Sequence, residues 1–303
     1  MLSRTADAIY WMSRQIERAE NLARLLDVLQ QMSLLPGMLS SATLRSPLRL
    51  SGSEDDYAAT GQALEIRSLM RFCTLDARHP ASIFCNLRAA RDNALCVRGN
   101  ITTEMWETIN ATWLELRDMK SESQSLQGYR PFLEWVKERS HLFRGVTFAT
   151  VRRNDTFHFC RLGTWLERAD NTLRILLVHT AANTDSASNW EILLHSLSAQ
   201  ENYRQRYGNT IGMQQVMALL LLDAEFPRSL LACCAGIEVA LAAIQGDNGY
   251  PPRRLCAEML AALRFTRIEQ ELTAGVAPML SAYLQRLTTL GQSIQNAYMG
   301  VGA

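Results

Sequence analysis

Carboxylates and arginines recur at the same spacing in two segments of this chain, and such groups can do acid–base or anion-binding chemistry. The first block reads Glu17-Arg18-Ala19-Glu20-Asn21 and is followed by Arg24. The second block, 150 positions later, reads Glu167-Arg168-Ala169-Asp170-Asn171 and is followed by Arg174. A half-buried carboxylate can have the raised pKa that a general base needs, and arginine suits carboxylate or phosphate binding. In that hypothesis Glu17 or Glu167 is the base, and Arg24, Arg174 or Arg228 holds the anion.

A structural role for the same residues is the alternative. Glu20 and Arg24 stand four positions apart with the glutamate leading, a spacing that stabilises a helix by a few tenths of a kcal/mol. A bridge from an arginine to a neighbouring helix would instead fix the packing register, as buried ion pairs sometimes do. The residues alone leave both readings open and assign no catalytic residue.

A helix must position each block, and helix geometry places the charged residues of each block directly beside an apolar face. At about 100° per residue, Ile9, Met12 and Ile16 lie on one apolar face with Ala19, Ala23 and Leu26. A polar stripe lies directly beside that face and consists of Ser13, Glu17, Glu20, Arg24 and Asp27. The second block places Glu167, Asp170 and Arg174 at the same angles. We therefore predict that both stripes border the core, that their charges are partly buried, and that the two stripes approach each other.

Helical periodicity continues along the rest of the chain. It predicts helices over residues 3–31, 57–75, 81–98, 102–122, 131–151, 155–179 and 190–207, and a serine-rich loop over 38–56. A further helix is predicted to start at Phe226 with Pro227 in its first turn. Because no stretch shows sustained strand alternation, the class is all-α. We expect a multi-helix bundle with the two motif-bearing helices packed centrally. The chain is read as a single domain, 1–303, with a pseudo-duplication of 1–150 and 151–303.

Composition narrows the functional classes. The net charge of +1 predicts neither a nucleic-acid binder nor a polybasic membrane protein. Seven cysteines, an odd number without a C-x-x-C motif, indicate buried thiols in a reducing compartment. The first residues run straight into a charged helical pattern, and the longest apolar tract, 230–244, is too short to cross a bilayer. The expectation is a soluble, cytoplasmic protein without a signal peptide.

Familiar cofactor and metal motifs are missing from the sequence. It contains no G-x-G-x-x-G, no G-x-x-x-x-G-K-[ST] and no G-x-S-x-G. A di-metal helix bundle usually needs two Glu-x-x-His pairs, and only Glu138 with His141 has that spacing. His158 and Cys160 are two positions apart, so on a helix they point away from each other. We therefore expect no cofactor and no metal.

Both blocks, with their surroundings, resemble the alpha-E family, a predicted all-helical domain named for its E-R motif. The opening Met1-Leu2-Ser3-Arg4, with Tyr10-Trp11 ahead of the first block, carries most of the resemblance. Further matches are Ala90-Arg91-Asp92-Asn93-Ala94, Trp106 with Asn110, Leu162-Gly163 before the second block, and Phe226-Pro227-Arg228-Ser229. The resemblance adds Arg91 and Asn93 to the candidate ligand-binding residues. Leu177 departs from the pattern, because the second copy often carries an aspartate there that matches Asp27.

The resemblance implies a bacterial protein that works beside other proteins. Members of that family are typically encoded next to, or fused to, a circularly permuted ATP-grasp protein and often a transglutaminase-like peptidase. The leading hypothesis is a helical binding module that acts with an ATP-grasp amide ligase in peptide synthesis or modification, with a peptide or an acyl phosphate as ligand. One alternative is an enzyme of amide-bond or acyl-transfer chemistry that uses the paired Glu/Arg motif. Another is a structural homo-oligomer, in which the blocks form a homodimer surface.

Overall fold

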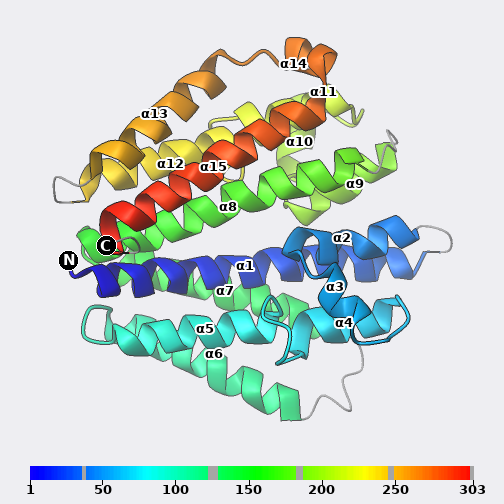
Figure 1. Cartoon of the computed structure of the whole chain (residues 1–303). Helices are drawn as coiled ribbons and strands as arrows, with labels where there is room; N and C mark the ends of the chain where they lie inside the picture. The colour runs from blue at the N-terminus through cyan, green and yellow to red at the C-terminus, as the bar shows by residue number, and fades with distance from the viewer. Residues whose placement is uncertain (36–38, 122–128, 182–186, 245–248, 301–303) are drawn as a thin grey trace. The chain divides into compact units, whose positions relative to one another are not determined.

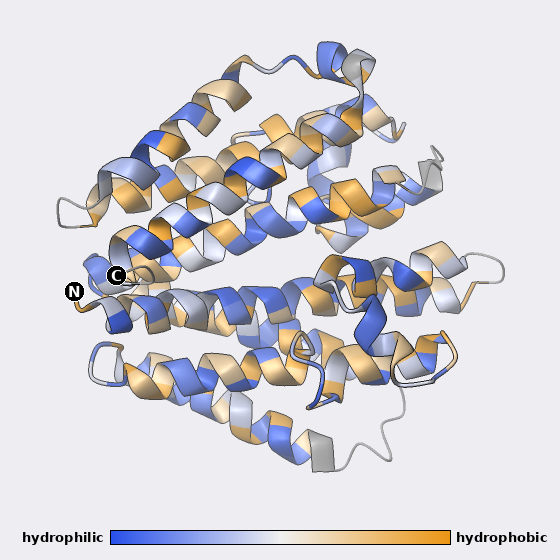
Figure 2. Cartoon of the chain, in the orientation of Figure 1, coloured by the Kyte–Doolittle hydropathy of each residue, from blue (hydrophilic) through white to orange (hydrophobic). Residues whose placement is uncertain are grey.

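The computed structural model describes residues 1–35, 39–121, 129–181, 187–244 and 249–300. All regular secondary structure in those ranges is helical, which confirms the all-α class (Figure 1). Hydrophobic and hydrophilic residues alternate along most of these helices, as amphipathic packing requires (Figure 2). None of the described helices is long and apolar enough to cross a membrane.

The chain divides into two compact units. The N-terminal unit is Trp11–Arg152, and the C-terminal unit combines Met1–Tyr10 with Arg153–Ala303. The first block lies in the N-terminal unit and the second block in the C-terminal unit. Helix α1 contributes to both, because it begins at Ser3 and its first turns belong to the C-terminal unit.

Four long helices share the core of the N-terminal unit. Ile16 of α1, Ala90 of α5, Ile109 of α6 and Phe143 of α7 line one small internal space, so these helices meet there. Proline in the first turn of α7 suits a helix start, as predicted for Pro131. The helices of this unit are α1 (Ser3–Ser33), α2 (Ser41–Ser51), α3 (Glu54–Ala58), α4 (Ile66–Leu75), α5 (Ile83–Cys96), α6 (Thr103–Ser121) and α7 (Arg130–Thr150).

Helix α8 lies at the centre of the C-terminal unit. It packs against α9, α12 and α15, and α13 completes a ring by contacting α12 and α15. Gly236 of α12 permits the close approach to α8, since a Cβ atom there would lie 2.5 Å from the ring of Trp165. The elements are α8 (Asp155–Ala181), α9 (Ala187–Ser196), α10 (Gln200–Tyr207), α11 (Met213–Met217), a π-helical turn η2 (Ala218–Leu222), α12 (Leu230–Ala243), α13 (Tyr250–Phe265), α14 (Ile268–Ala274) and α15 (Val276–Tyr298).

The predicted loop over 38–56 is wrong. Residue 38 lies outside the described residues, and most of the remainder forms α2 and the start of α3. The hydroxyl of Ser40 accepts a hydrogen bond from the amide of Thr43 at 3.1 Å and so caps α2. Leu44 and Leu48 are buried one turn apart. Serine therefore caps a short amphipathic helix here, whereas its abundance had indicated a loop.

Three other predicted boundaries also differ. The helix expected over 57–75 is broken between α3 and α4, where Gly61 adopts a φ of 68° that suits glycine. The helix expected over 190–207 starts at Ala187 and is interrupted after Ser196, where Ser198 has a φ of 53°. Pro227 precedes helix α12 instead of lying in its first turn, because Ser229 is the capping residue.

Candidate functional site

The polar stripe of the first block is buried, as predicted. Glu17 is 1% exposed and Glu20 is fully buried, while Ser13 and Asp27 are also buried. The neighbouring apolar face is inaccessible along its length, from Ile9 to Leu26. The stripe therefore carries carboxylates into the interior, where each negative charge needs a partner.

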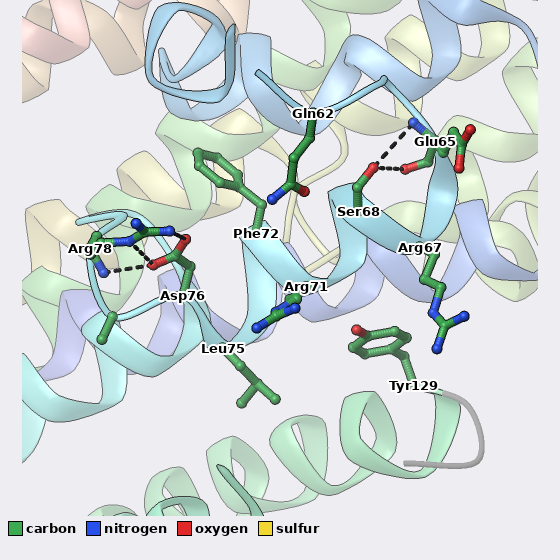
Figure 3. A pocket seen from close by; sticks show the side chains of 11 residues that line it. Gln62, Glu65, Arg67, Ser68, Arg71, Phe72, Leu75, Asp76, Arg78 and Tyr129 are labelled. Atoms are coloured by element: carbon green, nitrogen blue, oxygen red, sulfur yellow. Dashed lines mark hydrogen bonds and ion pairs between the residues drawn. The ribbon is translucent and has the colours of Figure 1, made fainter. Parts of the chain in front are cut away.

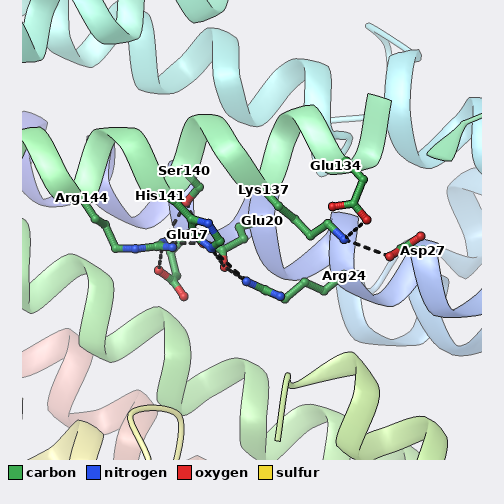
Figure 4. A network of polar contacts seen from close by, with 9 residues as sticks. All are labelled: Glu17, Glu20, Arg24, Asp27, Glu134, Lys137, Ser140, His141 and Arg144. Carbon is green, nitrogen blue, oxygen red and sulfur yellow. Dashed lines mark hydrogen bonds and ion pairs between the residues drawn. The ribbon is translucent and has the colours of Figure 1, made fainter. Parts of the chain in front are cut away.

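Partners of these carboxylates come from α7 and from α1 itself (Figure 4). The term buried carboxylate network is used here for five residues: Glu17, Glu20, Arg24, Ser140 and Arg144. Ser140 donates its hydroxyl to Oε2 of Glu20 at 2.7 Å. Nη1 of Arg144 donates to Oε2 of Glu17 at 2.8 Å, and it also contacts Oε2 of Glu20. Arg24 binds the other Glu20 oxygen, with Nε at 2.8 Å and Nη2 at 2.7 Å. Two buried carboxylates are thus held by guanidinium groups and by a hydroxyl group.

A histidine extends the network towards the surface. Nε2 of His141 lies 3.1 Å from Nη2 of Arg24 and 3.6 Å from Oε1 of Glu20. Because a guanidinium group only donates, the imidazole nitrogen is the acceptor in its contact with Arg24. His141 therefore serves as a polar neighbour of the ion pair.

A second ion pair joins the same two helices further along. Nζ of Lys137 lies 2.9 Å from Oδ2 of Asp27 and 2.7 Å from Oε1 of Glu134. Asp27 is the last member of the polar stripe and is buried. Ion pairs thus join α1 to α7 at two places along the helices. Such pairs would fix the packing register of the two helices, as the structural alternative proposes.

Sequence reasoning missed the α7 side of this site. One signal was present, because polar residues recur on α7 at positions 137, 140, 141 and 144, the spacing of one helix face. That pattern identifies a polar stripe but does not say which helix it meets. The residues concerned are Glu134, Lys137, Ser140, His141 and Arg144.

The second block repeats the acid–arginine pair in a more exposed setting. Nε of Arg174 lies 2.6 Å from Oδ2 of Asp170, at the same four-residue spacing as Glu20 and Arg24. Glu167 and Arg168 are buried, and the Arg168 guanidinium lies 5.2 Å from the centre of the Trp165 ring. Asn171 is half-buried. Of the predicted second stripe, Glu167 is therefore buried, Asp170 is partly buried and Arg174 is exposed.

The remaining candidates fall into two places. The backbone of the buried Arg228 contacts α8 directly after the second block, because its carbonyl accepts a hydrogen bond from the hydroxyl of Thr172 at 2.9 Å. Arg91 belongs to the N-terminal unit, lies 3.3 Å from Asp92 and packs 5.7 Å from the centre of the Trp106 ring. Asn93 is half-buried on the same helix. The approach of the two blocks to each other concerns both units and stays a prediction, as does any role of Arg18 and Asn21 in ligand binding.

The described side chains also bear on metal and thiol chemistry. Within the described ranges, no three His, Cys, Asp or Glu side chains gather as metal ligands would. Six of the cysteines are buried as free thiols and Cys96 is exposed. Burial raises the pKa of Cys73 and of Cys256 to about 12, so both stay protonated at neutral pH. A buried thiol of this kind is chemically inert.

Comparison with known proteins finds a matching family and related proteins. Residues 1–299 match the model of a family described as a predicted alpha-helical domain with a conserved ER motif. Uncharacterized proteins of Mycobacterium bovis and of two strains of Mycobacterium tuberculosis are 24% identical over 292 residues, which cover 88% of this chain and 33% of each relative. The chain thus spans about a third of the length of the curated relatives it matches. No solved structure matches the chain.

Proposed function

Because the chain belongs to the Alpha-E family, we propose that it is a helical binding module that acts with an ATP-grasp-type amide ligase in peptide synthesis or modification. The observation that supports a module most strongly is the buried carboxylate network. Glu17 and Glu20 are at most 1% exposed, and arginine side chains hold both. Carboxylates held in this way stabilise a scaffold, which is what a binding module needs.

The length of the relatives supports the same proposal. In each mycobacterial relative the matching region occupies only 33% of the chain. A helical region joined to a longer polypeptide acts beside other domains, so contact with a neighbouring protein or domain is a natural role for it. In this proposal the ligase supplies ATP-dependent activation, and the helical module binds the ligase, the peptide or the activated acyl phosphate.

Co-expression of this chain with an ATP-grasp-type amide ligase tests the proposal. We expect the two proteins to co-elute from a size-exclusion column, and we expect ADP release by the ligase with its peptide substrate to change when the module is added. An unrelated helical protein of similar size is the control for crowding and sticking. Absence of a complex, together with unchanged ADP release, would contradict the proposal.

The enzyme alternative makes a different demand on the same residues. A general base must come within hydrogen-bond reach of the proton that it removes. Burial of Glu17 and Glu167 favours the module over this alternative. The double variant Glu17→Gln/Glu167→Gln distinguishes the binding module from the enzyme. A folded variant that still binds the ligase but yields no product would support catalysis by this chain. A variant that melts early supports the scaffold. Light scattering of the isolated chain tests the homodimer.

A further inference from the structure

A pocket of about 880 Å³ opens in the N-terminal unit, away from the buried carboxylate network. Its wall is formed by α4, by the segments on either side of it, and by Tyr129, which directly precedes α7 (Figure 3). Ligand pockets in proteins commonly measure about 300–1,000 Å³, so this volume suits a small molecule. None of the residues that line it belongs to either repeated block.

Two arginines give the pocket a positive charge. Arg67 and Arg71 stand one turn apart on α4, and Figure 3 shows the Arg67 side chain extending towards Tyr129. Both arginines line the pocket. Neither guanidinium has a hydrogen bond or ion pair to any of the described residues. The third arginine of the pocket differs, because Nη2 of Arg78 lies 3.2 Å from Oδ2 of Asp76. Arg67 and Arg71 therefore hold two positive charges that no described carboxylate neutralises.

The hydroxyl of Tyr129 faces the same space. Burial raises the pKa of Tyr129, while the positive charges of Arg71 and Arg67 act in the opposite direction. The phenol consequently stays protonated at neutral pH and can donate one neutral hydrogen bond. Two guanidinium groups and one hydroxyl thus line the same pocket as donors from two different segments.

The rest of the pocket determines what kind of molecule would fit. Phe72 and Leu75 supply apolar surface on the same helix as the arginines. Glu65 is the remaining carboxylate of the lining, and Figure 3 shows its side chain pointing away from Tyr129. A ligand would therefore place its anionic group on the arginines and an apolar group along Phe72 and Leu75.

We propose that this pocket binds a phosphate monoester with an apolar or aromatic body. Two guanidinium groups that no described carboxylate neutralises match the charge of a phosphate monoester, about −1.5 to −2 at pH 7, better than the single charge of a carboxylate. The planar arginine fork binds phosphate oxygens through two parallel hydrogen bonds, and the Tyr129 hydroxyl supplies a further donor. This binding site goes beyond the proposed function and does not depend on it.

Calorimetric titration of the full chain with phenyl phosphate tests the proposal. We expect saturable binding that weakens about 10-fold or more in Arg67→Gln/Arg71→Gln, because each charge-assisted bidentate contact is lost. Arg117→Gln/Arg264→Gln removes the same charge from exposed positions outside the pocket and should bind like the wild type. Since Arg67 and Arg71 are exposed, the variant should keep the wild-type unfolding midpoint, which shows that its loss is local.

Two further probes separate the sources of affinity. Benzoate carries one charge on the same ring and should bind more weakly than phenyl phosphate. Inorganic phosphate lacks the ring and should also bind more weakly. Equal binding of phenyl phosphate to the wild type and to Arg67→Gln/Arg71→Gln would overturn the site, as would failure of phenyl phosphate to bind. Inorganic phosphate binding as tightly as phenyl phosphate would overturn the apolar part of the proposal.

Discussion

Replacing Arg144 by methionine removes the cation that Glu17 and Glu20 share. Nη1 of Arg144 lies 2.8 Å from Oε2 of Glu17, and the two carboxylates are at most 1% exposed. Breaking a buried ion pair from one side costs about 3–5 kcal/mol, and this is an upper bound here because Arg24 still holds Glu20 in the variant. Methionine keeps most of the length and the apolar character of the arginine stem, so the loss reports mainly on charge.

Arg139→Met is the matched control on the same helix. Arg139 lies 2.7 Å from Glu115, but the two side chains are 27% and 40% exposed. Ion pairs exposed to this degree contribute about 0–1 kcal/mol, because water screens them. The free energy of unfolding, from urea titration followed by far-UV circular dichroism, should therefore fall several times further for Arg144→Met than for Arg139→Met.

The reasoning would be refuted if Arg144→Met were no less stable than Arg139→Met when both are unfolded in urea at pH 7.5.

Three other substitutions probe the C-terminal unit, and Gly145→Ala on α7 of the N-terminal unit serves as a comparison. Gly236→Ala places a Cβ 2.5 Å from the Trp165 ring and should cost about 1–3 kcal/mol of thermal stability. Gly145→Ala, where nothing lies within 4 Å, should instead stabilise by about 0.5–1 kcal/mol. Burial lowers the pKa of His179 to about 4, against about 6.5 in the unfolded chain. The unfolded state therefore binds this proton more tightly, and stability falls by roughly 3 kcal/mol as the pH drops from 6.5 to 4. His179→Phe should lose less of its urea midpoint over that interval than the wild type; an equal loss would contradict this assignment. The hydroxyl of Ser229 caps α12 by accepting a hydrogen bond of 3.0 Å from the amide of Ala232. Ser229→Ala removes this cap and should lower the free energy of unfolding by about 1–2 kcal/mol.

Local features of the fold could be predicted from the sequence because they depend on neighbouring residues. The angle between Glu17 and the apolar face of α1 follows from helix geometry, so its burial could be predicted. Pro131 at the start of α7 is likewise a local signal. Helix α2 could not be predicted, because the burial of Leu44 and Leu48 within the folded unit stabilises it. Tertiary packing there outweighs a composition that is typical of loops.

The candidate site could be predicted on one helix only. Arg144 follows Glu17 by 127 positions, and no spacing rule connects residues so far apart. The pocket beside α4 was missed for a related reason. Arg67 and Arg71 are an ordinary exposed pair in the sequence, and only the position of Tyr129 in the structure shows that they share a space with it.

The two blocks share a local pattern but differ in environment. In the first block the arginine and the acid are 15% and 0% exposed, whereas in the second block they are 43% and 20% exposed. The same four-residue pair is therefore part of a desolvated network in one copy and close to water in the other, where such a pair contributes a few tenths of a kcal/mol. A charge pair that is costly to bury persists where its partners satisfy it. For the first block those partners are Ser140 and Arg144, so the role of the motif there depends on α7 as much as on the repeated residues.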